Sequence, residues 1–265
     1  MTRVAASRLD VWLAEHGLAE SREKAQALVM ARRVRVDGAP VTKPGTRVRE
    51  GASVSVEPGP AHVGRGALKL AGALDALDVD PGGKVAVDVG ASTGGFTETL
   101  LARGALRVYA VDVGRGQLHE SLRQDPRVLV RDRTNARSLS PEIVPEPCRL
   151  AVMDVSFISV RTILPALRDV LGSGADVVVL VKPQFEVGRA QVGRGGIVKD
   201  RELHLQAVRE VAEAAQALGY GVLGACPSPV PGAEGNREFF LRLVPGAPAL
   251  SGDELLAVVG KAVLP

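Results

Sequence analysis

The chain has 265 residues, of which 46% are hydrophobic and 24% charged, which is the balance of a folded protein rather than a disordered one. Its longest uninterrupted aliphatic run, residues 177–181, is far too short to span a bilayer, and residues 1–10 lack the apolar core of a signal peptide, so we expect a cytoplasmic protein outside the membrane. Cys148 and Cys226 are far apart and have no clustered Cys or His, which predicts two free thiols and neither a disulfide framework nor a metal site.

The positive charge is unevenly distributed along the chain. Residues 1–57 contain ten Lys or Arg and seven Asp or Glu, so this first fifth holds the whole formal excess of +3 and the remainder is balanced. A small basic part joined to a larger neutral part suggests that the small part binds a polyanion while the large part does something else.

The first segment predicts two short helices. Residues 8–13 place their apolar side chains on one helical face, and Gly17 ends that helix. Ser21 can cap a second helix, which has basic residues at its start and at its end. Basic side chains would therefore flank one small apolar face.

Strands follow these two helices. Residues 34–36 and the pair Asp37-Gly38 predict a strand that enters a tight hairpin, and residues 54–56 alternate as a second strand should. We therefore predict a compact α+β domain over residues 1–58. The prolines that follow, without any periodicity, predict a linker at residues 59–65.

From residue 66 onward, short β-branched runs alternate with helical stretches, a pattern typical of an α/β domain with a largely parallel sheet covered by helices. The last two strands are joined by turn residues without room for a crossover helix, so the final strand should be antiparallel. Seven strands with a reversed last one resemble the Rossmann-like methyltransferase fold, whereas a nicotinamide-binding domain usually closes on a parallel sixth strand. The predicted strands of this 66–265 domain are residues 84–89, 107–112, 128–131, 149–154, 176–182, 220–226 and 238–244.

A glycine-rich turn between the first of these strands and a helix is the predicted cofactor site, because glycine lets a ligand approach the backbone closely. Ser92 replaces the second glycine of the G-x-G-x-x-G pattern, so the loop fits a pyrophosphate poorly and an amino-acid moiety better. Asp88 is placed to meet a cofactor ammonium, and Asp112 can accept hydrogen bonds from ribose hydroxyls, although an acid there also serves NAD. The predicted cofactor residues are Asp88, Gly90, Ser92, Thr93, Gly94, Gly95, Phe96 and Asp112, with Asp132, Thr134 and Asn135 near the adenine.

Four ionisable residues outside any charge run are predicted to meet: Lys69, Asp154, Lys182 and Glu238. Charges beside such apolar strands need partners or a function. A ribose hydroxyl is a poor nucleophile, so an enzyme must remove or share its proton. A lysine can take that proton in its neutral form, which burial and a second cation favour. Two ordinary salt bridges are the alternative reading of the same four residues.

Six segments carry a resemblance to a known family: residues 64–70, 88–96, 112–118, 133–137, 154–158 and 181–186. On these motifs, the chain resembles the TlyA family, historically called haemolysin A, over nearly its whole length. The resemblance implies that S-adenosylmethionine is the methyl donor, that cytidine riboses in ribosomal RNA are the acceptors, and that Lys69, Asp154, Lys182 and Glu238 form a catalytic tetrad. It also implies that the first domain is an alpha-L RNA-binding motif, shared with a small-subunit ribosomal protein.

The basic residues of both domains become candidates for contacts to ribosomal RNA, within ribosomal subunits. We also expect the glycine-rich basic stretch 188–196 to form a mobile flap over the RNA. The candidates in the first domain are Arg8, Ser21, Arg22, Lys24, Arg32, Arg33 and Lys43, and those in the second are Arg65, Arg133, Arg137, Arg189 and Arg194.

Three other functions remain open from the sequence. A nicotinamide-dependent oxidoreductase with an RNA-binding appendage is compatible with the glycine loop and Asp112. A membrane-active haemolysin is suggested by the historical family name, although no strongly amphipathic basic helix is evident. A non-catalytic ribosome assembly factor would need the four ionisable residues only as structure.

Overall fold

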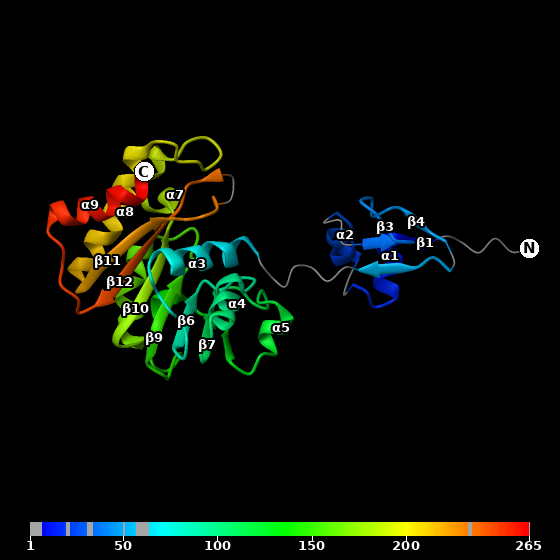
Figure 1. Ribbon diagram of the computed structural model, residues 1–265, viewed down its shortest axis with the longest axis horizontal. Helices are drawn as coiled ribbons and strands as arrows, with labels where there is room; N and C mark the ends of the chain where they lie inside the picture. The colour runs from blue at the N-terminus through cyan, green and yellow to red at the C-terminus, as the bar shows by residue number, and fades with distance from the viewer. Residues whose placement is uncertain are drawn as a thin grey trace, which may run out of the picture. The chain divides into compact units, whose positions relative to one another are not determined.

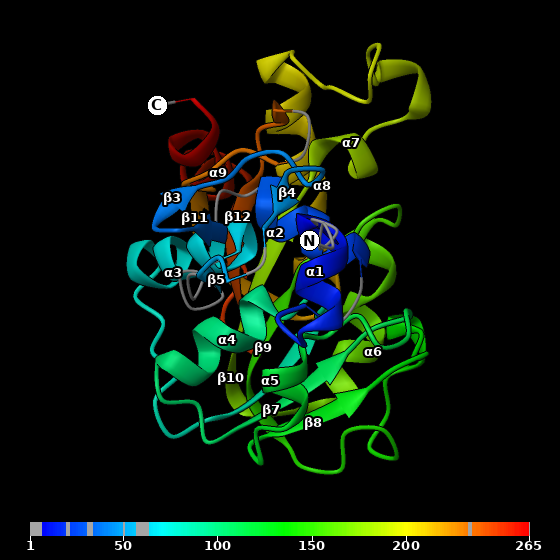
Figure 2. The same ribbon diagram turned by 90° about the vertical axis from the view of Figure 1, so that its right-hand side faces the viewer.

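The computed structural model describes residues 7–19, 22–30, 34–49, 51–56, 64–232 and 235–264. The chain divides into two compact units, Met1–His62 and Val63–Pro265 (Figures 1 and 2). The predicted linker falls mostly outside the described residues, so the domain limits 1–58 and 66–265 stay predictions. Within the described residues, no helix is long and apolar enough to cross a membrane.

The smaller unit is an α+β fold, as the sequence predicted. Its core contains Leu9 and Leu13 from the first helix, Ala25 and Val29 from the second, and Val34 from the sheet, all fully buried. Its described elements are β1 (Ser7–Arg8), α1 (Leu9–Glu15), α2 (Arg22–Met30), β2 (Val34–Val36), β3 (Ala39–Pro40), β4 (Arg47–Val48) and β5 (Val54–Val56).

The predicted hairpin joins β2 to β3. Asp37 and Gly38 have φ values of 51° and 79°, and a two-residue hairpin turn with both central residues in this region matches the twist of the strands. The strand β2 also pairs with β5, which completes a sheet of order β3-β2-β5. The pairing of β1 with β4 was not predicted, because two residues per strand leave no alternation to detect.

The larger unit contains a seven-stranded sheet of order β11-β12-β10-β9-β6-β7-β8, in which β12 is antiparallel to both of its neighbours and the other described pairings are parallel. The predicted Rossmann-like methyltransferase topology is therefore confirmed. Its helices and strands are α3 (Arg65–Ala76), β6 (Val85–Val89), α4 (Gly95–Ala102), β7 (Arg107–Val111), α5 (Glu120–Arg123), β8 (Val128–Arg131), β9 (Cys148–Met153), α6 (Leu164–Leu167), β10 (Leu171–Val181), α7 (Pro183–Glu186), α8 (Arg201–Ala217), β11 (Tyr220–Pro227), β12 (Phe239–Pro245) and α9 (Gly252–Val263), with short 3-10 turns at Ala136–Ser138, Val160–Thr162, Arg168–Val170 and Arg189–Gln191.

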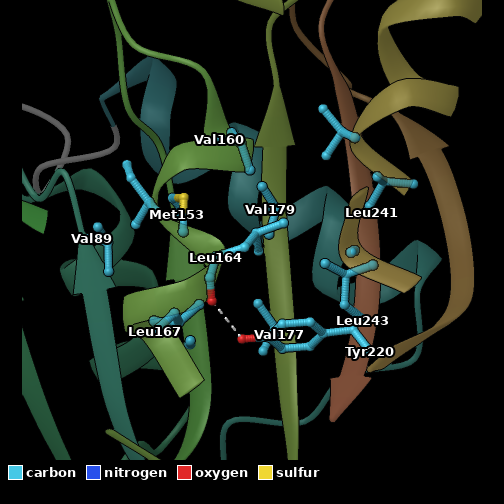
Figure 3. Packing of buried hydrophobic residues seen from close by; sticks show 14 of the residues in the cluster. Val89, Met153, Val160, Leu164, Leu167, Val177, Val179, Tyr220, Leu241 and Leu243 are labelled. Carbon is cyan, nitrogen blue, oxygen red and sulfur yellow. Dashed lines mark hydrogen bonds between the residues drawn. The ribbon is translucent and has the colours of Figure 1, made fainter. Parts of the chain in front are cut away.

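Side chains of successive strand residues alternate between two hydrophobic clusters, one on each face of the sheet. On one face, Val177 and Val179 of β10 pack with α6, α8 and α9; on the other, Val178 and Leu180 pack with α3, α4 and α5 (Figure 1). Figure 3 shows the first cluster, in which the Tyr220 hydroxyl donates to the Leu164 carbonyl over 2.9 Å. The helices thus hold the sheet from both sides and leave its edges to carry loops.

The predicted strand limits agree with the structure to within one residue, with one exception. The strand predicted at residues 176–182 starts at Leu171, where it pairs with Cys148, and the register shifts before Asp176. The helix after the glycine loop starts at Gly95, so Gly95 and Phe96 lie inside α4. In both places glycines obscure the pattern, because they have low propensity for strand and helix interiors.

Candidate active site

A cavity of about 520 Å³ opens at the edge of the sheet where the parallel strands end. In open α/β sheets this edge is the usual place for ligands, because the loops that follow the strands meet there. The cavity is lined by Gly90 and Ser92 of the loop after β6, residues 111–113 and Gln117 after β7, residues 134–137 after β8, and residues 154–158 with Ile163 after β9.

The glycine loop closes tightly on the segment that follows β9. Gly90 has a φ of 87°, and a Cβ atom added there would lie 2.3 Å from the Asp154 carbonyl oxygen. Gly94 has a φ of 105°, and an added Cβ would lie 2.2 Å from Leu122. Both positions require glycine in conformation and in space. The loop therefore forms a fixed floor for the cavity.

Asp112 is held in the cavity wall by backbone donors. Its Oδ2 accepts from the Ser92 amide over 2.8 Å, and its Oδ1 accepts from the Gly114 amide over 2.7 Å. Each carboxylate oxygen can accept a further hydrogen bond, so the group can also receive the hydroxyls of a ribose. This placement agrees with the cofactor role that the sequence predicts.

Asp88 is fully buried beneath the glycine loop. Its Oδ2 accepts from the Thr97 hydroxyl over 2.6 Å, and within the described residues its Oδ1 has no hydrogen-bond partner. Burial raises the pKa of Asp88 to about 7, and the Thr97 hydrogen bond opposes this shift only in part. A buried carboxylate with a free oxygen is suited to an ammonium group of a ligand.

The other predicted cofactor residues divide into two groups. Thr134 and Asn135 line the cavity, as expected for residues near an adenine. Asp132 lies outside the described lining, because its carboxylate accepts from the Gly116 amide and from Arg123, each over 3.1 Å. The remaining loop residues also lie outside that lining: Thr93 is exposed, and Gly94, Gly95 and Phe96 belong to the packing around α4.

The four ionisable residues form two ion pairs. Lys182 Nζ lies 2.5 Å from Asp154 Oδ1 and donates to Ser156 Oγ over 2.9 Å. Lys69 Nζ donates to Glu238 Oε2 over 2.5 Å, and both of these side chains are almost completely buried. Asp154 lines the cavity and is partly exposed, so the first pair faces the ligand space.

Strand register explains why the two pairs meet. Val181 of β10 pairs with Phe239 of the antiparallel β12, so the next residues, Lys182 and Glu238, face each other across the two strands. Asp154 directly follows β9, the other neighbour of β10. Lys69 reaches Glu238 from α3. The arrangement brings together all four residues that the sequence singled out.

Several residues of the site carried no individual signal in the sequence. Ser156 contacts the Lys182 amine, and Gln117, Phe157 and Ile163 line the cavity. Ser156 and Phe157 belong to the 154–158 motif, which was noted only as a block. Gly232 was also missed: a Cβ there would lie 2.1 Å from Glu238 Oε1, so a larger residue would displace that carboxylate.

In the smaller unit, two of the residues predicted to contact RNA form ion pairs with an acidic side chain. Arg8 and Arg22 both donate to the buried Asp10, and these arginines keep the pKa of Asp10 well below its usual range. About half of each arginine side chain remains exposed. Lys43 is exposed. Ser21, Arg32, Arg33 and the side chain of Lys24 lie outside the described part of the chain.

In the larger unit, all five predicted RNA contacts are exposed: Arg65, Arg133, Arg137, Arg189 and Arg194. Arg65 also donates to the carbonyls of Pro231 and Gly232 over 2.5 and 2.6 Å. The predicted flap lies between α7 and α8, where Figure 2 shows it extending from the sheet. The Asn236 amide donates to the Gly196 carbonyl over 3.0 Å, so one end of the flap is tethered close to Glu238.

Comparison with known proteins gives the class of each unit. Residues 62–244 match the model of the FtsJ-like methyltransferase family, and residues 7–54 match the S4 domain. The 16S/23S rRNA (cytidine-2'-O)-methyltransferase TlyA of Mycobacterium tuberculosis is 51% identical over 89% of both chains. Hemolysin A of Brachyspira hyodysenteriae is 35% identical over 89% of this chain and 99% of that protein. A solved structure from Streptococcus thermophilus, labelled a candidate hemolysin, has a TM-score of 0.73 at 39% identity and covers 97% of this chain and 95% of its own.

The fold and the site thus define an FtsJ-like methyltransferase with an N-terminal S4 RNA-binding domain, and S-adenosylmethionine is the methyl donor of this class. The chain belongs to the TlyA family. This membership decides against the nicotinamide-dependent oxidoreductase. Within the described residues, the unpartnered Oδ1 of Asp88 beneath the glycine loop fits the ammonium group of this donor.

Proposed function

We propose that the protein methylates the ribose 2'-hydroxyl of cytidines in ribosomal RNA, of the small subunit, the large subunit or both. The observation that carries this proposal is the position of Asp154 on the cavity wall, with Lys182 ion-paired to it and Glu238 opposite Lys182 across the strands. The name of the 51% identical relative supports the same reaction and the same acceptor. The S4 domain supports RNA as the substrate.

The residues that would hold the methyl donor are Asp88, toward its ammonium, Asp112, toward its ribose, and Thr134 and Asn135, toward its adenine. Bound S-adenosylmethionine supplies an electrophilic methyl group. The protein's own contribution is to fix these groups before the RNA arrives, because a reactive pair held at short range needs no further ordering.

Lys182 is the residue that handles the proton of the acceptor hydroxyl. Lys182 Nζ would accept the proton of the acceptor hydroxyl, so that the hydroxyl oxygen could attack the electrophilic methyl group that bound S-adenosylmethionine would supply. Asp154 and Ser156 hold the amine in place. Lys69 forms an ion pair with Glu238, which lies opposite Lys182 across the two strands and is thereby held in place.

Replacing the proton-handling residue tests this function directly. Lys182→Ala should leave RNA affinity nearly unchanged and lower methyl transfer to ribosomal RNA by at least about 100-fold, because general base catalysis contributes that much. Lys261→Ala, which removes an exposed lysine of α9, is the matched control and should keep full activity. Retained turnover in the Lys182 variant would refute this role, whereas no methyl transfer by the unmodified protein would favour the non-catalytic assembly factor.

The acceptor nucleotides can be found in cells. Mapping 2'-O-methylation of ribosomal RNA with and without the gene should reveal missing marks at cytidines in one or both subunits. Missing marks on other nucleotides, or none, would contradict the proposed acceptor. A lytic function would instead leave the ribosomal RNA of both strains identical.

A further inference from the structure

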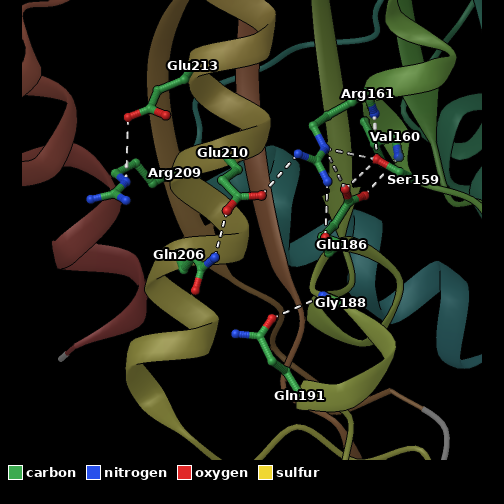
Figure 4. Close-up of polar contacts among 10 residues, drawn as sticks. All are labelled: Ser159, Val160, Arg161, Glu186, Gly188, Gln191, Gln206, Arg209, Glu210 and Glu213. Carbon is green, nitrogen blue, oxygen red and sulfur yellow. Dashed lines mark hydrogen bonds and ion pairs between the residues drawn. The ribbon is translucent and has the colours of Figure 1, made fainter.

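Glu186 ends the 181–186 motif, yet the proposed reaction makes no use of it. It lies at the end of α7, four residues after Lys182, and only 5% of it is exposed. Its Oε2 accepts from the Ser159 hydroxyl over 2.5 Å, and its Oε1 accepts from the Val160 amide over 2.8 Å (Figure 4). One buried carboxylate therefore holds two consecutive residues of another segment.

Arg161 strengthens the same attachment. Its Nη2 donates to the Glu186 carbonyl over 3.0 Å, and its Nε lies 3.3 Å from Glu186 Oε2. Its Nη1 donates to Glu210 of α8 over 3.0 Å, so the cluster is anchored on a long helix (Figure 4). Burial raises the pKa of Glu186, and these donors oppose that shift. The hydrogen bonds are what make a buried acid tolerable at this position.

The residues held by Glu186 directly follow the cavity wall. Residues 154–158 line the cavity and form neither helix nor strand, and Phe157 has a φ of 65°, which side-chain-bearing residues seldom adopt. Such a segment keeps one conformation only if its surroundings hold it. At its start, Asp154 contacts Lys182; at its end, Ser159 contacts Glu186. The segment that starts at Asp154 and the segment that starts at Lys182 are thus connected by two contacts, one at each end of the residues that line the cavity.

We propose that Glu186 is a positioning residue of the methyltransferase site: by holding Ser159 and Val160, it keeps the 154–158 segment where Asp154 and Ser156 meet the Lys182 amine. The inference rests on the proposed role of Lys182 and extends it to a group that touches neither substrate nor cofactor. What Glu186 supplies is hydrogen-bond geometry rather than charge.

Two substitutions at Glu186 separate geometry from charge. In Glu186→Gln, the amide oxygen can still accept from Val160, and the amide nitrogen can donate to the Ser159 oxygen, which can act as acceptor. This variant should keep kcat within about fivefold of the wild type. Glu186→Ala leaves both partners unheld, so kcat should fall about 100-fold while KM for RNA changes little, since a misplacement of about 1 Å has that effect.

Glu210→Ala is the matched control, because it removes a carboxylate of the same cluster that contacts Arg161 but neither Ser159 nor Val160. It should keep kcat within about twofold, as expected for a partly exposed pair. If Glu186→Ala folds poorly, Ser159→Ala serves in its place, and it should lower kcat with little change in unfolding. Full activity in folded Glu186→Ala, or in Ser159→Ala where that variant replaces it, overturns the proposal. So does an equal loss in Glu186→Gln or in Glu210→Ala.

The Lys182 variant distinguishes this inference from the function beneath it. Loss of turnover in Lys182→Ala together with full activity in Glu186→Ala would remove only the positioning role. Retained turnover in Lys182→Ala would remove the proposed mechanism itself.

Discussion

Asp88 is a buried acid that has no cationic partner among the described residues. Within the described residues, one of its oxygens has a hydroxyl donor and the other has none, so its ionised form is poorly stabilised and its pKa rises to about 7. An acid of this kind weakens the fold when it ionises and strengthens ligand binding when the ligand supplies the missing positive charge.

The stability of the ligand-free protein should therefore depend on pH. Between about pH 4 and pH 7, the unfolded chain has lost the Asp88 proton while the folded chain keeps it, so the folded state binds more protons and stability falls as pH rises. The free energy of unfolding, measured in urea at pH 5 and pH 8, should drop by on the order of 3 kcal/mol from this group alone.

Asp88→Asn provides the control, since it keeps the acceptor for Thr97 and cannot titrate. Its unfolding free energy should change less than that of the wild type over the same pH range. An identical pH dependence in the two proteins would show that Asp88 ionises normally in the folded state.

At the residue scale, the sequence predicted charges at strand ends better than it predicted their partners. Asp154 and Lys182 stood out because a lone charge after an apolar strand is conspicuous. Ser156 and Glu186 did not, because their importance lies in contacts to segments 26 and 27 residues away. Polar loop residues of this kind have no periodicity from which a pairing could be inferred.

At the scale of elements, Asp10 joins the two helices of the small unit. Its carboxylate, on α1, accepts hydrogen bonds from Arg22 and Gln26 of α2. Arg8, which directly precedes α1, donates to the same carboxylate. Two of the arginines that the sequence predicts to contact RNA therefore also bond to Asp10 within the small unit. A helix pair with so small a core depends on such a contact.

Asp10→Asn should destabilise the small unit by about 2 kcal/mol, because it weakens the charge-assisted hydrogen bonds that Arg8 and Arg22 donate to this buried side chain. Trp12, the single tryptophan of the chain, lies in α1, so its fluorescence during urea unfolding of the full chain reports on this unit. Asp37→Asn is the control, since the Asp37–Arg49 pair is exposed and should contribute little to stability. Equal effects of the two substitutions would contradict the role of Asp10.

The elements themselves were largely predictable. Each of the seven large strands was found, because β-branched runs between turn residues are a strong signal. The first residues of β10, Leu171 to Ala175, were missed because two glycines interrupt them and their pairing with β9 is irregular. Tertiary pairing, rather than local preference, makes that stretch a strand.

At the scale of the whole molecule, the presence of a basic S4 domain and a separate methyltransferase domain predicts that RNA and the methyl donor bind with different salt dependence. RNA affinity should fall by at least about tenfold when salt rises from 0.1 to 0.3 M, because phosphate contacts release counterions. Affinity for S-adenosylmethionine, measured by calorimetry over the same range, should change by less than about threefold, since its proposed contacts are a few short-range polar interactions rather than many phosphate contacts. Salt-insensitive RNA binding would show that phosphate contacts contribute little.

The position of β12 has a consequence for synthesis. β12 is the last strand in the chain, yet it lies between β11 and β10, so β11 emerges from the ribosome before the strand that attaches it to the sheet. A nascent chain that has reached Tyr220 already contains every residue that lines the described cavity, whereas Glu238 has still to be made. During synthesis, the ability to bind the methyl donor should therefore appear before the ability to transfer the methyl group. Formation of the β11–β12 hairpin then adds β12 to the sheet and brings Glu238 to the site at the same time.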